Sequence, residues 1–413
     1  MDDLRLCLSL YACEPHRGSE PGVGWAWALG MAKRHETWVL TRANNRDVIE
    51  TELDRLGVPA NERPHFVWVD LPLWVRWLKK RGIVPVGLYY LLWQFSARHV
   101  WNRTGIRVDI IHHITFNSFV VPGVWWHRRE KVVLGPLGGM SICPPQYLRC
   151  FPFVSRVKEY FRGMVRSYGK FGFFFRKARS SADYVIYTTN EMLRLLGGGM
   201  RSVVMLETAV PTEMKPRLPR TDAHKRERRF VWAGTLAGHK AGEIAIRSFA
   251  MAFGASEKPH MLEIYGSGPD RGKWANLVRS LGATEYIRFR GTVPQTELWE
   301  RISSSKALLF TSIRDTSGNV ALEALALGTP VICFQHQGVA QIVDASCALL
   351  VEPSDWNKTI NDFAVALRRF ADDPDLADTF GVSGQKRVFE KFTWCHKFDI
   401  VDSLYQVICQ EGR

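Results

Sequence analysis

The chain has 413 residues, a length at which two folded domains are expected rather than one compact core. Apolar residues make up 46% of it and charged residues 23%, which excludes a disordered or fibrous protein. The formal net charge is +14, and residues 1–210 have 29 Lys and Arg against 17 Asp and Glu, whereas residues 211–413 have 26 against 24. We therefore expect the N-terminal half to meet nucleic acid, an anionic membrane surface or an acidic ligand.

Strand and helix signals alternate along the first half. A helical pattern covers residues 22–34, and apolar runs predict strands at residues 4–12, 38–43, 65–71, 108–116, 132–139, 184–190 and 202–207. This alternation is typical of parallel α/β architecture. Residues 83–97 are too short for a membrane span and contain Pro85, Gly87 and Gln94, so we expect a buried or interfacial helix there.

The composition changes at residues 211–229, which have three prolines, many charges and few apolar side chains, and which we interpret as a linker. Beyond the linker the alternation restarts. Strands are expected at residues 229–235, 260–266, 286–291, 307–312 and 330–335, helices lie between them, and a helical tail follows. The sequence thus predicts two doubly wound domains, 1–210 and 230–390, and a C-terminal helix over 391–413. Ligands bind such sheets at the carboxyl ends of the strands, so we expect a cleft between two facing domains.

The eight cysteines show neither a CxxC pair nor a metal-binding spacing, and the acidic N-terminus does not resemble a signal peptide. We expect reduced thiols and a cytoplasmic location.

The stretch from Thr311 to Val331 is the most informative for chemistry. A strand ends at Thr311, and a helix begins near Ser317, Gly318, Asn319 and Val320, where backbone N–H groups and the helix dipole suit a phosphate. Asp315 precedes the helix, and Glu323 follows eight residues later. One carboxylate is thus expected to face a sugar and the other a ribose.

These two acids, followed by LEALALGTPV, resemble the motif of the family-4 retaining glycosyltransferases, which have the GT-B fold of two Rossmann-like domains. The segments ACEPHRGSEPGVGW, ITFNSFVVPGVWW with GPLGG, AGTLAGHK and IYGSGP resemble the same family in the same order. The resemblance implies that the C-terminal helix packs back on the first domain.

The resemblance also implies roles. Asp315, in place of the more usual glutamate, would hold donor-sugar hydroxyls and stabilise positive charge at the anomeric carbon, and Glu323 would bind the ribose. Lys240 would neutralise the donor diphosphate. Thr235 stands after Gly234 where the family has an arginine, so His239, Arg290, Arg314 or the backbone of Ser317–Val320 is expected to compensate. Gly266 and Gly268 would line the nucleotide pocket.

In the first domain, the strand ending at residue 116 is expected to present His112 or His113 to the donor sugar, with the other histidine buried. The glycines Gly22 and Gly24 open a helix, and we expect that loop to face the ligand; a turn that merely needs glycine is the alternative.

Residues Arg149 to Arg179 contain nine Lys or Arg, nine Phe or Tyr and one acid. Such interleaving suits an anionic membrane surface, although a buried aromatic helix with a solvated basic face is an alternative. No nucleic-acid-binding motif is visible, so we do not expect a nucleic-acid partner.

The sequence therefore predicts a retaining, hexosyltransferase-type enzyme that moves a sugar from a UDP- or GDP-linked donor to a glycan or lipid-linked acceptor in polysaccharide or glycolipid biosynthesis. We expect it to be peripheral at the inner face of the cytoplasmic membrane and to use neither a metal ion nor a cofactor. The alternatives are an epimerase-like GT-B enzyme that acts on the nucleotide sugar alone, and a non-enzymatic protein that binds membrane or nucleic acid.

Overall fold

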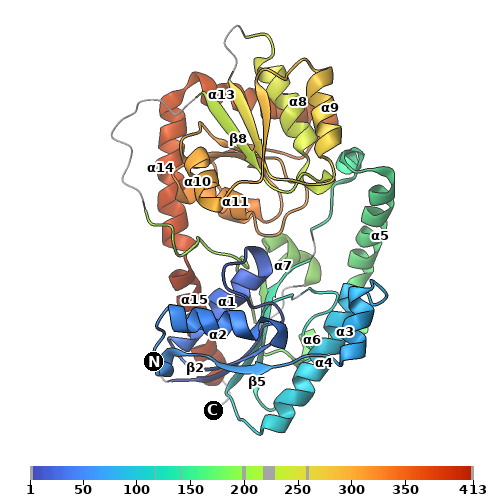
Figure 1. The fold of residues 1–413 in the computed structure, drawn as a ribbon, viewed down its shortest axis with the longest axis vertical. Coiled ribbons are helices and arrows are strands. Elements are labelled where there is room, and N and C mark those ends of the chain that lie inside the picture. Colours follow the sequence, from blue (N-terminus) through green and yellow to red (C-terminus); the bar gives the residue numbers. More distant parts are fainter. Residues whose placement is uncertain are drawn as a thin grey trace. The chain divides into compact units, whose positions relative to one another are not determined.

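The computed structural model describes residues 3–116, 118–139, 141–197, 201–216, 228–256 and 260–410. The chain forms two compact units (Figure 1). The first comprises Met1–Met140, Met164–Thr208 and Trp394–Arg413, and the second comprises Ser141–Gly163 and Ala209–Thr393. Most of the expected linker, residues 217–227, lies outside the described residues.

The first unit contains a seven-stranded sheet with strand order β3-β2-β1-β4-β5-β6-β7, in which all pairs are parallel. Its strands are β1 (Arg5–Ser9), β2 (Glu36–Thr41), β3 (His65–Trp68), β4 (Ile110–His113), β5 (Lys131–Leu137), β6 (Tyr184–Tyr187) and β7 (Ser202–Val204). Its helices are α1 (Ser19–Ala32), α2 (Arg46–Arg55), α3 (Leu73–Lys80), α4 (Val86–Thr104), α6 (Phe173–Ser181), α7 (Asn190–Leu196) and α15 (Trp394–Gln410).

Both faces of this first sheet are buried. In β1, Leu6 and Leu8 belong to one apolar cluster with Trp27 of α1, whereas Cys7 belongs to a second cluster with Trp93 of α4. This explains why the strands of a parallel sheet are continuous apolar runs in the sequence.

The C-terminal helix α15 packs into the first unit, as the resemblance implied. Its Phe398 lies so close to α1 that a Cβ on Gly30 would be 1.9 Å from the Phe398 ring. Asp402 of α15 accepts hydrogen bonds from Arg34 at 2.5 Å and from His35 at 3.1 Å. In Figure 1 this helix, in red, lies beside the blue helix α1.

The second unit contains a six-stranded sheet with strand order β10-β9-β8-β11-β12-β13, again all parallel. Its strands are β8 (Arg229–Ala233), β9 (Met261–Tyr265), β10 (Ile287–Gly291), β11 (Leu308–Phe310), β12 (Val331–Phe334) and β13 (Ala348–Val351). Its helices are α8 (Gly242–Phe253), α9 (Arg271–Ser280), α10 (Gln295–Ser303), α11 (Asn319–Ala326), α12 (Val339–Ile342), α13 (Trp356–Asp372) and α14 (Pro374–Lys391). Residues 348–351 were expected in the helical tail, which is wrong, because they form β13.

The expected first domain, 1–210, differs from the first unit at Ser141–Gly163. This segment belongs to the second unit because Tyr147, Cys150 and Phe151 are buried in the core of the second sheet. The Tyr147 hydroxyl is also hydrogen-bonded to Thr359 of α13 at 2.8 Å. Helix α5 (Phe153–Gly169) therefore begins in the second unit and ends in the first.

Candidate active site

The residues predicted for chemistry in the second unit come together at the carboxyl ends of its strands. Lys240 lies in the loop after β8, Asp315 in the loop after β11, and the two side chains form an ion pair. The exposed fractions of these side chains are 22% and 11%. The Thr311 hydroxyl donates to the Lys240 carbonyl at 3.0 Å and so ties the two loops together.

Asp315 is held in place from several sides. Its Oδ1 accepts hydrogen bonds from the backbone N–H groups of Ser317, at 3.1 Å, and Gly318, at 3.0 Å, and its own N–H donates to Gln337 at 2.7 Å. Burial alone would raise the pKa of Asp315, but the Lys240 ammonium and the two N–H groups lower it below its ordinary value. Asp315 is therefore a fixed carboxylate at neutral pH.

This geometry corrects one expectation about the start of α11. The N–H groups of Ser317 and Gly318 were expected to face a phosphate, but both donate to Asp315. Asn319 and Val320 begin the helix itself, and the buried Oδ1 of Asn319 accepts no hydrogen bond from the described part of the chain.

Glu323 lies on α11 and is held by two neutral donors of α10. Trp299 Nε1 donates to it at 2.9 Å and Gln295 Nε2 at 3.3 Å. Burial raises the pKa of Glu323. Three partners of these carboxylates were not predicted from the sequence: Gln295, Trp299 and Gln337. Amides and an indole outside a motif give no signal until the fold brings them to a carboxylate.

The glycines of the two loops at this edge allow one backbone to approach the other. A Cβ on Gly266 would be 2.0 Å from the carbonyl oxygen of Gly234, and one on Gly268 would be 2.4 Å from that of Leu236. The exposed Thr235 lies between these contacts. The glycines thus keep the loops after β8 and β9 together.

The three side chains expected to compensate for Thr235 differ in their partners. Arg290 donates from Nε to the buried Glu263 at 2.9 Å, and Glu263 also pairs with Arg229. Arg314 forms an ion pair with Glu159 of α5. Burial, followed by the Lys240 charge, lowers the pKa of His239, so its ring is neutral at pH 7.

In the first unit, the expectation that one of two histidines lies at an exposed edge is wrong. His112 and His113 are both 0% exposed. His112 contacts the Tyr405 hydroxyl at 2.6 Å and the Gly135 carbonyl at 2.8 Å, and His113 contacts the Tyr90 hydroxyl at 2.7 Å and that of Ser9 at 2.9 Å. Burial lowers the pKa of each to about 3. Both are neutral core residues.

The structure explains why residues 22 and 24 are glycines. A Cβ on Gly22 would be 2.1 Å from the carbonyl oxygen of Arg17, and one on Gly24 would be 1.9 Å from that of Ala12. Both glycines lie within α1 and neither has a positive φ, so a close carbonyl oxygen, rather than a left-handed turn, is the structural reason for glycine at each position.

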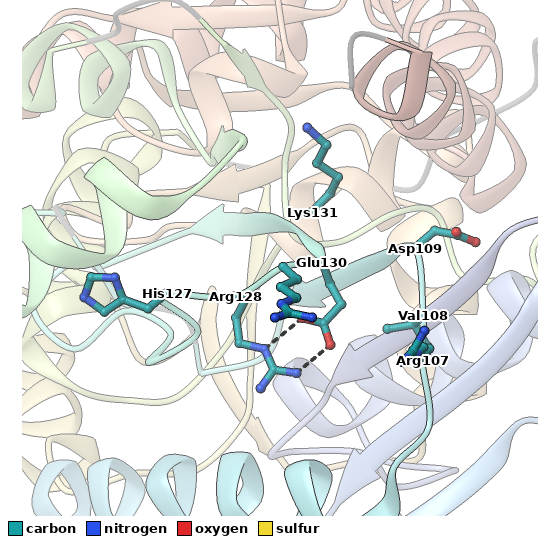
Figure 2. Close-up of a pocket in the computed structure, with 8 residues that line it drawn as sticks. Arg107, Val108, Asp109, His127, Arg128, Glu130 and Lys131 are labelled. Atoms are coloured by element: carbon teal, nitrogen blue, oxygen red, sulfur yellow. Dashed lines mark hydrogen bonds and ion pairs between the residues drawn. The ribbon is translucent and has the colours of Figure 1, made fainter. Parts of the chain in front are cut away.

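A pocket of about 590 Å³ lies elsewhere in the first unit and contains none of the predicted site residues (Figure 2). It is lined by residues that precede or begin β4 and β5: Arg107, Val108, Asp109, His127, Arg128, Arg129, Glu130 and Lys131. Figure 2 shows Arg128 paired with Glu130, a contact of 2.6 Å. The pocket is thus at the amino ends of these strands, away from the edge where ligands bind such sheets.

Helix α5 and its neighbours expose large apolar side chains. Within the part of the chain that the structure describes, no helix is both long and apolar enough to cross a membrane. The exposed aromatic residues of α5 and α6 and the turn between them are Phe153, Tyr160, Phe161, Tyr168, Phe171 and Phe173.

The second unit matches a known protein family. Residues 216–387 fit the family model described as "Glycosyl transferases group 1". This segment, which is less than half of the chain, is similar to the glycosyltransferases of that group. It contains Lys240, Asp315 and Glu323 and the loops that hold them.

Curated relatives resemble the chain over part of its length. The D-inositol 3-phosphate glycosyltransferase of Streptomyces avermitilis is 28% identical over 44% of this chain and 40% of its own length. The lipopolysaccharide core biosynthesis glycosyltransferase LpsD of Rhizobium meliloti is 29% identical over 32% of this chain and 37% of its own. The matched segments thus span less than half of each relative.

Solved structures resemble the whole chain, including the unit that the family model does not cover. Sucrose-phosphate synthase of Thermosynechococcus elongatus matches 99% of this chain and 98% of its own, with a TM-score of 0.62 and 18% identity. HepE of Anabaena in complex with UDP matches 99% of both chains, with a TM-score of 0.60 and 14% identity. Together with the two parallel sheets, these matches show that the chain has the GT-B fold.

Proposed function

We propose that this protein is a retaining glycosyltransferase that moves a sugar from a nucleoside-diphosphate donor to a hydroxyl of a glycan or lipid-linked acceptor. The observation that carries the proposal is the Lys240–Asp315 ion pair at the carboxyl ends of the strands of a domain similar to the group 1 glycosyltransferases, with Glu323 on the following helix. The names of the relatives, and a structural neighbour in complex with UDP, support a nucleotide-sugar donor.

The roles follow from the chemistry of each group. In the transfer, the bond from the anomeric carbon to the diphosphate breaks, the acceptor oxygen bonds to that carbon on the same face, and the acceptor proton passes to the leaving phosphate. Lys240 stabilises the negative charge that develops on the diphosphate. Asp315, ionised and fixed, faces the positive charge at the anomeric carbon, and Asn319 Oδ1 is available to a sugar hydroxyl.

Glu323 is the candidate for the ribose hydroxyls. Trp299 and Gln295 orient its carboxylate with neutral hydrogen bonds, so its charge is not cancelled by a cation among these partners. A hydroxyl donating to such a carboxylate makes a charge-assisted hydrogen bond. No step in this scheme needs a metal ion or a resident cofactor.

The decisive experiment is transfer from a panel of radiolabelled UDP-, GDP- and dTDP-sugars to a membrane lipid extract, with wild type and Glu323→Gln. We expect label in the lipid or glycan fraction with wild type and a loss of at least about 100-fold in Glu323→Gln, since a hydrogen bond to a charged group contributes about 1.5–3 kcal/mol and the donor is then misplaced. Glu297→Gln on the neighbouring helix α10 is the matched control.

The outcomes separate the alternatives. Conversion of the donor sugar without any acceptor would indicate an epimerase-like enzyme. Equal transfer by wild type and Glu323→Gln would remove Glu323 from the site, and vesicle binding with no reaction of any donor would indicate a non-enzymatic protein.

We further propose that helices α5 and α6 bind an anionic membrane surface, which would place the enzyme at the inner face of the cytoplasmic membrane, where a lipid-linked acceptor lies. The exposed rings of this region alternate with exposed cations, including Lys158, Lys170 and Arg176. Rings at headgroup depth and cations beside anionic lipid both favour this surface.

The test is co-sedimentation with vesicles that contain phosphatidylglycerol. The triple variant Lys158→Glu, Lys170→Glu, Arg176→Glu should release the protein, because each cation near such a surface contributes about 1 kcal/mol. The control is reversal of Lys358, Lys386 and Arg301 on α13, α14 and α10, which makes the same change in charge outside α5 and α6 and should have little effect. Unchanged binding of the α5–α6 variant would contradict this assignment.

A further inference from the structure

The segment Ser141–Gly163 contacts the loops that carry Lys240 and Asp315. The Ile142 carbonyl accepts a hydrogen bond at 2.9 Å from Gln337 Nε2, and the Oε1 of the same Gln337 accepts from the N–H of Asp315. The Ser141 and Thr316 hydroxyls lie 3.3 Å apart. The segment is therefore in direct contact with the loop that carries Asp315.

The same segment also lies against the loop that carries Lys240. A Cβ on Gly238 would be 2.9 Å from the Phe151 ring and 3.0 Å from the Cys150 carbonyl oxygen. Only glycine permits this approach. The contact is at Gly238, two residues before Lys240, and Phe151 is two residues before the start of α5.

Helix α5 then adds a cluster of three charges. The Glu159 carboxylate, whose side chain is 7% exposed, pairs with Arg314 and accepts from Arg162 Nη1 at 2.7 Å. The N–H of Ile313, which directly precedes Arg314, donates at 3.0 Å to the carbonyl of His239, the neighbour of Lys240. The cluster therefore lies within electrostatic range of the Lys240 loop.

The Lys240–Asp315 pair and the Glu159 cluster differ in net charge. Lys240 and Asp315 cancel each other, so their pair is neutral, whereas Arg162 and Arg314 together with Glu159 carry a net charge of +1. A nucleoside diphosphate is an anion and needs an excess of cations. Arg229 and Arg290 with Glu263 also carry a net charge of +1, but these arginines lie on β8 and β10 and not in the loops that carry Lys240 and Asp315.

We infer that Arg162 and Arg314, held together by Glu159, form the second cationic contact of the donor diphosphate, the one that the family resemblance places at Thr235. This inference rests on the proposed function. Each guanidinium has five N–H donors, so contact with one shared carboxylate leaves donors for phosphate oxygens. Glu159 is a positioning residue. It lies on α5, which also carries part of the proposed membrane-binding surface.

The test is titration calorimetry of the full chain with UDP, GDP and dTDP, and with the nucleoside that corresponds to whichever diphosphate binds. Arg162→Gln and Arg314→Gln should each weaken the diphosphate about tenfold and leave the nucleoside unchanged, because only the diphosphate contact is lost. Arg162→Lys should recover part of the affinity. Lys158→Gln, exposed one turn earlier on α5, removes the same charge outside the cluster and is the matched control.

The double variant gives a second readout. Because the two arginines share Glu159, their effects should not add. Wild-type affinity in both single variants, an equal loss for the nucleoside, or an equal loss in Lys158→Gln would overturn the inference while the proposed function stands. If UDP, GDP and dTDP all fail to bind wild type, the proposed function falls and takes the inference with it.

Discussion

Removing the Lys240 ammonium should destabilise the second unit, because it leaves the Asp315 carboxylate buried without its cation. Loss of one partner from a buried pair costs about 3–5 kcal/mol. We expect about 3 kcal/mol for Lys240→Ala, at the lower end, because solvent reaches Lys240 and two backbone N–H groups still contact Asp315. A domain of this size loses about 2–4 °C in Tm per kcal/mol, so the transition should fall by about 6–12 °C.

The sign of the pH dependence follows from the pKa of Asp315. In wild type this pKa is lowered, so the stabilisation is present above the unfolded value near 3.9 and is lost as the pH falls through the folded value. In Lys240→Ala the effect of burial prevails and raises the pKa of Asp315. The free-energy cost of burying the ionised Asp315 is therefore largest at neutral pH. The Tm difference between the two proteins should therefore shrink between pH 7 and pH 4.

Differential scanning calorimetry of four proteins checks this reasoning: wild type, Lys240→Ala, Asp315→Asn and the double variant. Because Asp315→Asn removes the buried charge, the double variant should be more stable than Lys240→Ala, yet neither should transfer sugar. The control Lys358→Ala breaks an exposed pair with Asp362 and should cost no more than about 0.5 kcal/mol. A Tm for Lys240→Ala equal to that of wild type, or no rescue by Asp315→Asn, would refute the argument.

Three further predictions concern the first unit. The pKa of His113 is about 3 in the folded protein and near 6.5 in the unfolded chain. The free energy of unfolding measured with urea should therefore decrease as the pH is lowered from 6.5 to 3, and His113→Gln should make this decrease smaller. Gly24→Ala should lower the Tm by about 10 °C or prevent folding, since the new Cβ would meet the Ala12 carbonyl, whereas Gly18→Ala, with nothing within 4 Å, should be nearly neutral. Burial lowers the pKa of Lys397 to about 7, so stability should rise from pH 7 toward pH 10 as the unfolded state alone keeps the proton, and Lys397→Met should abolish that rise in a urea titration.

Most strands could be predicted from the sequence because both faces of each sheet are covered. Strands such as β1 and β12 are then unbroken apolar runs bounded by turns. The same covering explains the error at the histidines. His112 and His113 are adjacent and point to opposite faces of β4. One of them was expected to face the donor sugar, but helices bury both faces of this central strand.

The residues of the donor site could be predicted only where they belong to a local motif. Asp315 and Glu323 are eight residues apart around one loop, and their spacing is visible in the sequence. The partner of Arg314 is 155 residues away, on α5, and nothing local to either residue marks the pair. Gln337 is similarly invisible, since its amide has a role only after the loop folds onto Asp315.

The basic excess is divided between the two structural units differently from how it is divided between the two halves of the sequence. Residues 141–163, which lie in the N-terminal half but fold with the second unit, carry Arg149, Arg156, Lys158 and Arg162 against Glu159 alone. Part of the basic excess of the first half is thus built into the unit that contains the Lys240–Asp315 pair, where a neutral pair by itself gives an anionic donor no net attraction. Under the two proposals above, the interleaved basic and aromatic residues of α5 would divide between two surfaces: Glu159 and Arg162 would face the donor loops, and the exposed rings and lysines would face the membrane.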